Sequence, residues 1–270
     1  MLEIQHISKT FFPDTSNAVM SLRNVSLSIA NASFVNVIGT NGSGKSTLLN
    51  AVAGTFVPDS GQILLNGENI TTQPEFQRAR RIGRVFQNPF YGTAPSMTIA
   101  ENLALASRRG LSRRLGWCLS RQLRIQIADR LQSLKMGLED RLDNPIGTLS
   151  GGQRQAITLL MATWVKPDLL LLDEHTAALD PASADQVIRL THEIITRDRL
   201  TTVMVTHSMQ QAVSLGDRII MMHQGQIVAD LTGAEKTSSR PHDLLNRFDA
   251  LRRRDQLTPA VRDLLQRQYV

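Results

Sequence analysis

A glycine-rich stretch, residues 39–47, has the residue types and the spacing of a loop that binds phosphate. It reads Gly-Thr-Asn-Gly-Ser-Gly-Lys-Ser-Thr and matches the Walker A pattern G-x-x-x-x-G-K-S. Glycines let several backbone N–H groups converge on one anion, and the N-terminus of a following helix adds partial positive charge. Lys45 can reach the outer phosphates of a nucleotide, and the hydroxyl of Ser46 can bind Mg²⁺. The residues assigned to this site are Gly39, Thr40, Asn41, Gly42, Ser43, Gly44, Lys45, Ser46 and Thr47.

The segments on either side favour this interpretation over a glycine-rich turn that matches the pattern by chance. Residues 34–38, Phe-Val-Asn-Val-Ile, form an apolar run that predicts a buried strand. Residues 47–53, Thr-Leu-Leu-Asn-Ala-Val-Ala, predict a helix. Strand, loop and helix N-terminus therefore follow one another as the motif requires.

Two acids that follow a second apolar run are the next residues that could do chemistry. Residues 169–172 are four leucines, and Asp173 and Glu174 come directly after them. Ligands of open α/β sheets bind at the carboxyl ends of the strands. Asp173 is placed to hold Mg²⁺ directly or through water, and Glu174 can polarise an attacking water as general base. Two surface acids at a strand end are the alternative, which the phosphate loop in the same chain disfavours.

Residues 150–152, Ser-Gly-Gly, stand before a predicted helix over residues 151–163. The free N–H groups of a helix N-terminus form a second anion site. In one chain this site lies in a helical region away from residues 39–47.

The elements that must position these residues alternate between strands and helices. Apolar runs predict strands at residues 82–86, 168–173 and 201–207, and residues 182–197 predict a helix. This alternation predicts an α/β fold with parallel strands. Residues 96–166 predict an all-helical insertion, and residues 11–14, Phe-Phe-Pro-Asp, predict a loop. The tail, residues 233–270, has a linker-like start followed by amphipathic segments, and a packing element, a partner site and partial disorder all remain open.

The composition is that of an ordinary soluble globular protein, with 41% hydrophobic and 20% charged residues. An aromatic content of 4% argues against a module that binds nucleic acid by stacking on bases. A single cysteine, Cys118, excludes an internal disulfide and is typical of a reducing compartment. No run of about 18 apolar residues occurs, so other chains must supply any membrane spans.

The net charge of +6 suits anionic partners, and the excess is concentrated in two arginine clusters. Each cluster is either a solvated face or a functional surface, and contact of the first with lipid or with a membrane protein stays open. The first cluster comprises Arg108, Arg109, Arg113, Arg114, Arg121 and Arg124, and the second comprises Arg252, Arg253 and Arg254.

Further motifs resemble those of one family, the ABC (ATP-binding cassette) ATPases. Residues 149–153, Leu-Ser-Gly-Gly-Gln, are identified as its signature peptide, which is far more specific than the phosphate loop. Residues 178–180, Ala-Leu-Asp, resemble the D-loop, Gln87 resembles the Q-loop glutamine, and His207 resembles the switch histidine. The motifs stand in the family's sequence order, and the resemblance covers about residues 1–232.

The resemblance implies an α/β P-loop NTPase (RecA-like) core with an antiparallel β subdomain and an inserted α-helical subdomain. The implied core comprises residues 1–87 and 165–232, the helical subdomain about residues 88–164, and the tail residues 233–270. The implied activity is that of an ATP hydrolase with ATP and Mg²⁺ as cofactors.

The resemblance also implies roles for individual residues. Gln87 would contact the metal or the attacking water, and His207 would hold the γ-phosphate and order the water. Phe11 would stack on adenine, with Phe12 as the alternative and a purely structural phenylalanine as the competing interpretation. The remaining implied contacts cross a head-to-tail homodimer, in which the signature of one copy closes over the γ-phosphate bound by the other. They are made by Ser150, Gly151, Gly152, Gln153 and Asp180.

Two positions depart from the family pattern. His175 stands where the family usually has a proline, and Met161 stands where it commonly has an arginine. Residues 173–180 resemble a branch of bacterial importer ATPases, some of which serve amino-acid-type solutes, including tryptophan-like ones.

The resemblance therefore implies the ATPase subunit of a bacterial importer of an amino acid or similar small solute. Such a subunit works at the cytoplasmic face of the membrane, peripherally, with two transmembrane permease subunits and a solute-binding protein. Residues 88–96 would help to form the groove for the permease, with Phe90, Tyr91 and Met97 as contacts or as core residues. Nucleic acid is not an expected partner. The alternatives are a soluble ABC ATPase acting on nucleic acid or ribosomes and the ATPase of a multi-subunit exporter.

Overall fold

The computed structural model describes residues 1–111 and 119–256, and of residues 252–256 the backbone alone. Cys118, Arg113 and Arg114 therefore lie outside the described residues, as do residues 257–270 of the tail. The side chains of the second arginine cluster lie outside them as well.

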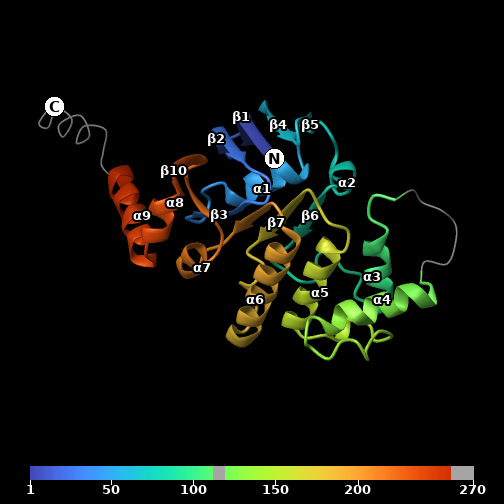
Figure 1. Ribbon diagram of the computed structural model, residues 1–270. Coiled ribbons are helices and arrows are strands. Elements are labelled where there is room, and N and C mark those ends of the chain that lie inside the picture. Colours follow the sequence, from blue (N-terminus) through green and yellow to red (C-terminus); the bar gives the residue numbers. More distant parts are fainter. Residues whose placement is uncertain (112–118, 257–270) are drawn as a thin grey trace, which may run out of the picture.

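The larger of two β-sheets is built around the strand that leads into the phosphate loop (Figure 1). Its five parallel strands have the order β9, β3, β8, β7 and β6, and β10 is added antiparallel to β9. Every residue of β3 is buried, which explains why its side chains are apolar except for Asn36, whose amide donates to the carbonyls of Ala212 and Leu215 at 3.2 and 2.6 Å. The strands are β3 Phe34–Gly39, β6 Ile82–Val85, β7 Leu169–Asp173, β8 Thr202–Val205, β9 Arg218–His223 and β10 Gln226–Thr232. The predicted parallel α/β sheet is confirmed.

A smaller antiparallel sheet lies on one side of the first, with strand order β2-β1-β4-β5 (Figure 1, top). Its strands are β1 Leu2–Phe11, β2 Val19–Ile29, β4 Ser60–Leu65 and β5 Glu68–Asn69. Helix α1, Lys45–Ala53, packs between the two sheets, because Leu48 and Leu49 share one apolar cluster with residues of β1 and β3. The loop predicted over residues 11–14 is wrong at its first residue. Phe11 pairs with Val19 and extends β1, because the long β1–β2 ladder continues one residue further.

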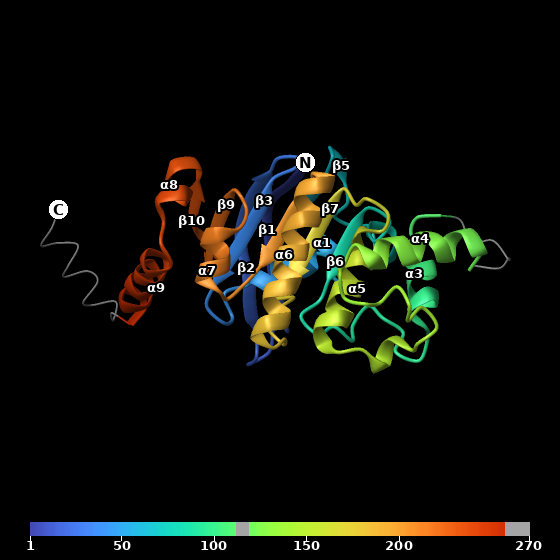
Figure 2. The same cartoon turned by 60° about the horizontal axis from the view of Figure 1, so that its bottom comes forward.

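Helices cover the opposite face of the larger sheet. Figure 2 shows α6, Pro181–Asp198, lying across this face, with α5, Gly151–Thr163, beside it. Both pack through a second apolar cluster onto Leu170, Leu172 and Met204 of the sheet. The other elements of this helical layer are α3 Ile99–Ser107, α4 Arg121–Gln132 and the 3₁₀ turn Ile146–Thr148. Among the described residues, no helix combines the length and the apolarity that crossing a membrane requires.

The described part of the tail is helical and packs on the sheet edge that β9 and β10 form. Helices α8, Gly233–Ser238, and α9, Pro241–Gln256, follow β10 (Figure 1, left). Leu244 and Phe248 of α9 are buried in a third apolar cluster with Ala212 of α7, Met209–Ser214. This part of the tail is therefore a packing element of the fold.

One buried arginine caps the C-terminal end of helix α1. Arg78, the last residue of α2, Glu75–Arg78, is 2% exposed, and its guanidinium donates to the carbonyls of Ala51 and Val52 at 2.8 and 2.9 Å. It also donates to the carbonyl of Thr71 at 2.8 Å. Burial lowers the pKa of Arg78 to about 10, which leaves the cation charged at neutral pH and beside the negative end of the helix dipole.

We expect Arg78→Met to lower the free energy of unfolding by about 2–4 kcal/mol, because buried carbonyls would lose their donors. Urea unfolding followed by circular dichroism measures this loss. Arg80→Met, two residues further on at an exposed position, is the control and should change stability by less than about 0.5 kcal/mol. Equal losses in the two variants would contradict a capping role for Arg78.

Candidate functional site

The carboxyl edge of the parallel strands gathers three segments that are far apart in the sequence. Strand β3 ends at Gly39, β7 ends at Asp173, and β8 ends two residues before His207. Strand β8 pairs with both β3 and β7, so the three segments leave the sheet side by side. A ligand at this edge can contact all three.

The phosphate loop has the backbone geometry of an anion cradle. Gly44 is the N-cap of α1 with φ +99°, and no side chain caps the helix, so its first N–H groups stay free. A Cβ atom on Gly44 would lie 2.5 Å from the carbonyl oxygen of Ser21, so only glycine fits there.

Two polar side chains of this loop fit a phosphate ligand. Lys45 is buried, and its Nζ donates to the carbonyls of Gly39 and Thr40 at 2.9 and 3.0 Å. Burial lowers the pKa of Lys45, whereas Glu174 and Asp173 raise it. The hydroxyl of Ser43 is buried without a hydrogen-bond partner. A phosphate oxygen could accept hydrogen bonds from both side chains.

Two of the three predicted Mg²⁺ ligands, Ser46 and Asp173, lie next to each other. The Ser46 hydroxyl is 3.5 Å from Oδ1 of Asp173. Burial raises the pKa of Asp173, and Arg84, 3.8 Å from its Oδ2, acts in the opposite direction. Hydroxyl and carboxylate oxygens are the ligands that Mg²⁺ prefers. The described residues contain no group of three or more His, Cys, Asp or Glu side chains that could hold a metal, so phosphate and water oxygens would have to complete the shell.

Glu174 and His207 are in direct contact, with 2.5 Å between Oε1 of Glu174 and Nε2 of His207. The Glu174 side chain is 11% exposed and that of His207 is 45% exposed, so the imidazole lies on the solvent side of the carboxylate. Glu174 has φ +46°, an uncommon value for a residue with a Cβ atom, and its N–H donates to the carbonyl of Val205 at 3.0 Å. The sequence predicted separate roles for the two residues but not this contact.

His175, a departure from the family pattern, is a buried structural residue. It is 2% exposed, and its Nε2 lies 3.1 Å from the hydroxyl of Thr191 on α6. That hydroxyl donates to the carbonyl of Val187 at 2.7 Å, so it accepts from an Nε2–H. Burial lowers the pKa of His175 to about 4, so the imidazole is neutral at neutral pH. The residue after Glu174 is thus anchored to α6 by a side chain.

Arg84 is a site residue that sequence reasoning missed. It lies on β6, and besides approaching Asp173 it donates to Oδ1 of Asn50 and stacks 4.5 Å from the ring centroid of Phe86. The available signal was an arginine in the middle of a short buried strand, where a charge needs a partner.

Gln87 is exposed and borders a groove of about 530 Å³ that also reaches Asp173 and Gly151. Gln155 of α5 donates to the carbonyl of Phe86 at 3.1 Å, which ties the start of the Gln87 segment to the helix of the Ser-Gly-Gly motif. The segment from Phe86 to Tyr91 lines one wall of the groove.

Ser150 is the N-cap of α5 and forms a capping box with Gln153. A Cβ atom on Gly152 would lie 2.7 Å from Cβ of Ser183, so this glycine lets α5 pack against α6. In the part of the chain that the structure describes, the side-chain hydrogen bonds of Ser150 and Gln153 stay within this turn and do not reach residues 39–47.

Asp180 and Phe11 have structural contacts of their own. Asp180 caps α6 by accepting from the N–H of Ser183 at 3.0 Å, and hydrogen bonds with Ser183 lower its pKa. Phe11 packs edge-on against Phe56 with ring centroids 5.3 Å apart, which favours the structural alternative for this residue. Phe12 is 67% exposed.

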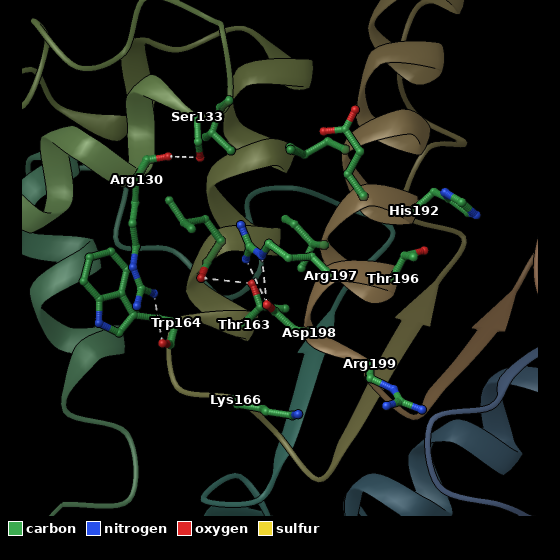
Figure 3. A pocket seen from close by; sticks show the side chains of 15 residues that line it. Arg130, Ser133, Thr163, Trp164, Lys166, His192, Thr196, Arg197, Asp198 and Arg199 are labelled. Atoms are coloured by element: carbon green, nitrogen blue, oxygen red, sulfur yellow. Dashed lines mark hydrogen bonds and ion pairs between the residues drawn. The ribbon is translucent and has the colours of Figure 1, made fainter.

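A cavity of about 1040 Å³ lies between α4, the end of α5 and α6 (Figure 3). Arg130 stacks 4.1 Å from the Trp164 ring centroid, and Arg197 pairs with Asp198 at 2.8 Å. None of the residues predicted to bind the nucleotide or the metal lines this cavity.

Part of the first arginine cluster also serves the fold. Arg109 donates to the carbonyls of Ala162 and Val165, and Arg124 forms two hydrogen bonds with Asp143, at 2.9 and 2.7 Å.

Comparison with known proteins supports the same interpretation. The sequence model of the ABC transporter family matches residues 22–177, a range that includes the phosphate loop and the acid pair. A tyrosine transport ATP-binding protein of Clostridioides difficile (strain R20291) is 41% identical over 92% of this chain and 99% of that protein. A methionine import ATP-binding protein of Shouchella clausii (strain KSM-K16) is 32% identical over 92% of this chain and 69% of that protein.

Solved structures share the fold. The ATP-binding cassette MJ0796, in a dimeric post-hydrolysis state bound to ADP and Pi, has a TM-score of 0.73 and 26% identity. The match covers 86% of this chain and 98% of that one.

We expect Thr191→Val to lower the free energy of unfolding by about 1–3 kcal/mol, because the buried Nε2–H of His175 would lose its acceptor. Urea unfolding measures the change. Thr196→Val is the matched control, since it makes the same substitution at an exposed position of α6. A Thr191→Val protein as stable as this control would show that His175 does not depend on Thr191.

Proposed function

Because this chain belongs to the ABC transporter family, whose members bind and hydrolyse ATP, we propose that it is the ATPase subunit of a bacterial importer for an amino acid or a similar small solute. The observation that supports the catalytic assignment best is the contact between Glu174 and His207, made beside the Lys45 loop at one edge of the sheet.

ATP binding is assigned to the phosphate loop. The free N–H groups at the start of α1 and the Lys45 ammonium bind the phosphates, with Ser43 as a further donor. Ser46, Asp173 and Gln87 would hold Mg²⁺, directly or through water, and the ion would neutralise charge on the phosphates. Stacking of Phe11 on adenine stays a prediction that rests on the family resemblance alone.

Hydrolysis is assigned to Glu174 and His207. Glu174 is the general base that takes a proton from the attacking water, and it is nearly buried, which keeps bulk water from competing. His207 contacts the Glu174 carboxylate through Nε2 from the solvent side. A neutral imidazole has a single N–H, so in this proposal the Nε2–H turns to the γ-phosphate when the nucleotide is bound. This arrangement orients the water instead of merely supplying a base.

A second copy of the chain completes the site in this proposal. The N-terminus of α5 is exposed at Ser150, and its first N–H groups have no partner among the described residues. In a head-to-tail homodimer, Ser150 to Gln153 of one copy would close over the γ-phosphate bound by the other, and Asp180 would contact the partner. The dimeric state of the similar cassette MJ0796 supports this arrangement.

The membrane partners are assigned to the groove beside Gln87. Phe90 and Tyr91 are 52% and 64% exposed, as side chains of a docking surface would be. The guanidinium of Arg154 lies 3.8 Å from the Phe90 ring centroid, so a permease that presses on Phe90 acts on the helix of the signature. The protein would then sit peripherally at the cytoplasmic face of the membrane under two permease subunits.

The type of solute is proposed from the relatives. The tyrosine transport protein at 41% identity spans nearly the same length as this chain. We therefore propose an amino acid as solute, delivered by a solute-binding protein, and we do not propose nucleic acid as a partner.

We expect Glu174→Gln to retain ATP affinity and to lower the rate of hydrolysis by at least about 100-fold, because glutamine cannot accept the proton. Phosphate release and binding of a fluorescent ATP analogue measure the two effects. Glu193→Gln, which removes an exposed carboxylate on α6, is the control. Hydrolysis at the wild-type rate in Glu174→Gln would refute the base assignment.

We expect Ser150→Arg, made in the Glu174→Gln background, to abolish the ATP-dependent dimer, because arginine would fill the space of the partner's phosphates. Light scattering with and without ATP measures the association. Ser133→Arg at an exposed position of the helical layer is the matched control and should still dimerise. Loss of the N-cap costs only about 1 kcal/mol, so ATP binding by the monomer should persist. Dimerisation of Ser150→Arg with ATP would rule out the proposed two-fold site.

A further inference from the structure

The segment that follows Glu174 and the segment that carries His207 are joined by one glutamine side chain. Gln211, on α7, accepts a hydrogen bond from the hydroxyl of Thr206 at Oε1, over 2.9 Å. Its Nε2 donates to the hydroxyl of Thr176 over 3.4 Å. Thr206 precedes His207 by one residue, and Thr176 follows Glu174 by two.

The oxygen of the Gln211 amide faces Thr206. The backbone N–H of Ser208 donates to the Thr206 hydroxyl at 3.0 Å. This bond uses one of the two lone pairs of the hydroxyl, and the hydroxyl proton is donated to Oε1 of Gln211. The NH₂ group of Gln211 then faces Thr176, as a donor must.

Gln211 departs from the usual behaviour of a glutamine at its helical position. It is the third residue of α7, and its N–H donates to the N-cap Ser208 at 3.2 Å. A glutamine there commonly turns back to the N-cap backbone to form a capping box. Gln211 instead bonds Thr176, which lies 35 positions away in the loop after β7.

The two hydrogen bonds of Gln211 restrain both the loop after Glu174 and the loop that carries His207. Thr206 is 4% exposed and Thr176 is 8% exposed, so their hydroxyls have little access to water and depend on protein partners. On the other side of the loop, His175 is held by Thr191 of α6. The residues after Glu174 are thus fixed to α6 and to α7.

We propose that Gln211 is a positioning residue for ATP hydrolysis, which sets the placement of Glu174 relative to His207 by linking Thr176 to Thr206. Its side chain bonds Thr176 and Thr206, so Gln211 acts through these two residues, and its role rests on the proposed roles of Glu174 and His207. Without the link, the two loops can move apart, and a shift of about 1 Å in a reacting group can lower a rate by about 100-fold. ATP affinity should not change, because Lys45 and the phosphate loop have their own contacts.

The test compares Gln211→Met with Gln210→Met. Methionine keeps the length of the side chain and removes both hydrogen bonds, and Gln210 is the exposed neighbour on the same helix. We expect kcat to fall by about 10- to 100-fold in Gln211→Met, with an unchanged Kd for a fluorescent ATP analogue. Gln210→Met should match the wild type in both quantities.

A conservative variant should restore the rate. In Gln211→Glu the carboxylate can accept from both threonine hydroxyls, so kcat should stay within about threefold of the wild type. Thr176→Val, which keeps the shape and loses the hydroxyl, should lower kcat as Gln211→Met does, and Thr176→Ser should not. The double variant Thr176→Val/Gln211→Met should be no slower than either single variant, because both break the same link.

Several results would overturn the proposal. These are a wild-type kcat in Gln211→Met or in Thr176→Val, a fall in kcat matched by an equal fall in ATP affinity, or additive losses in the double variant. If Gln211→Met does not fold, the rates of Thr176→Val and Thr176→Ser decide the question alone. Glu174→Gln, measured in parallel, distinguishes failure of the proposed function from failure of the Gln211 proposal. ATP hydrolysis at the wild-type rate in Glu174→Gln refutes the proposed function. An inactive Glu174→Gln beside a fully active Gln211→Met refutes the role of Gln211 only.

Discussion

The parallel pairing of β3, β8 and β7 is the constraint on which the rest of the structure depends. Hydrogen bonds between these strands make their carboxyl ends leave the sheet at one edge, so three loops with different chemistry must meet there. Because β8 lies between the other two, His207 stands between the phosphate loop and the acid pair in the order of the strands. Helices α1 and α6 on the two faces bury the sheet and hold its edges in place.

Buried polar side chains then make this edge stiff. Lys45, His175, Thr176 and Thr206 are all largely removed from water, and the hydrogen bonds of each are directed at a defined partner. Such groups cost free energy when a partner is lost, so the loops have few alternative arrangements. The Glu174–His207 pair is exposed mainly on the side of His207.

The N-terminus of α5, in the helical layer, differs from the strand edge because its side-chain hydrogen bonds stay within one turn. Ser150 and Gln153 satisfy each other within one turn, and the buried contact of Gly152 with Ser183 serves packing alone. Among the described residues, the first N–H groups of α5 have no hydrogen-bond partner, which is the physical basis for proposing that a second copy uses them. The groove lined by Gln87, Phe90 and Gly151 connects this helix start to the surface proposed for the permease. Arg154 and Gln155, both on α5, contact Phe90 and Phe86, which lie near opposite ends of the Phe86–Tyr91 wall of the groove. Movement of the helix and movement of the groove are therefore linked.

Residue types and spacing alone determined the class of the fold, the phosphate loop, the acid pair and the family. These features are local: a buried parallel strand needs a continuous apolar run, and an anion cradle needs glycines at fixed positions, so both can be read from the order of residues. The tertiary structure alone decided the rest. The contact of Glu174 with His207, the approach of Arg84 to Asp173, the anchoring of His175 by Thr191 and the link through Gln211 join residues that lie 16 to 89 positions apart. The extension of β1 to Phe11 likewise depends on a partner strand. No local pattern specifies such pairs, because they arise only when packing of the two sheets and the helical layer brings the segments together.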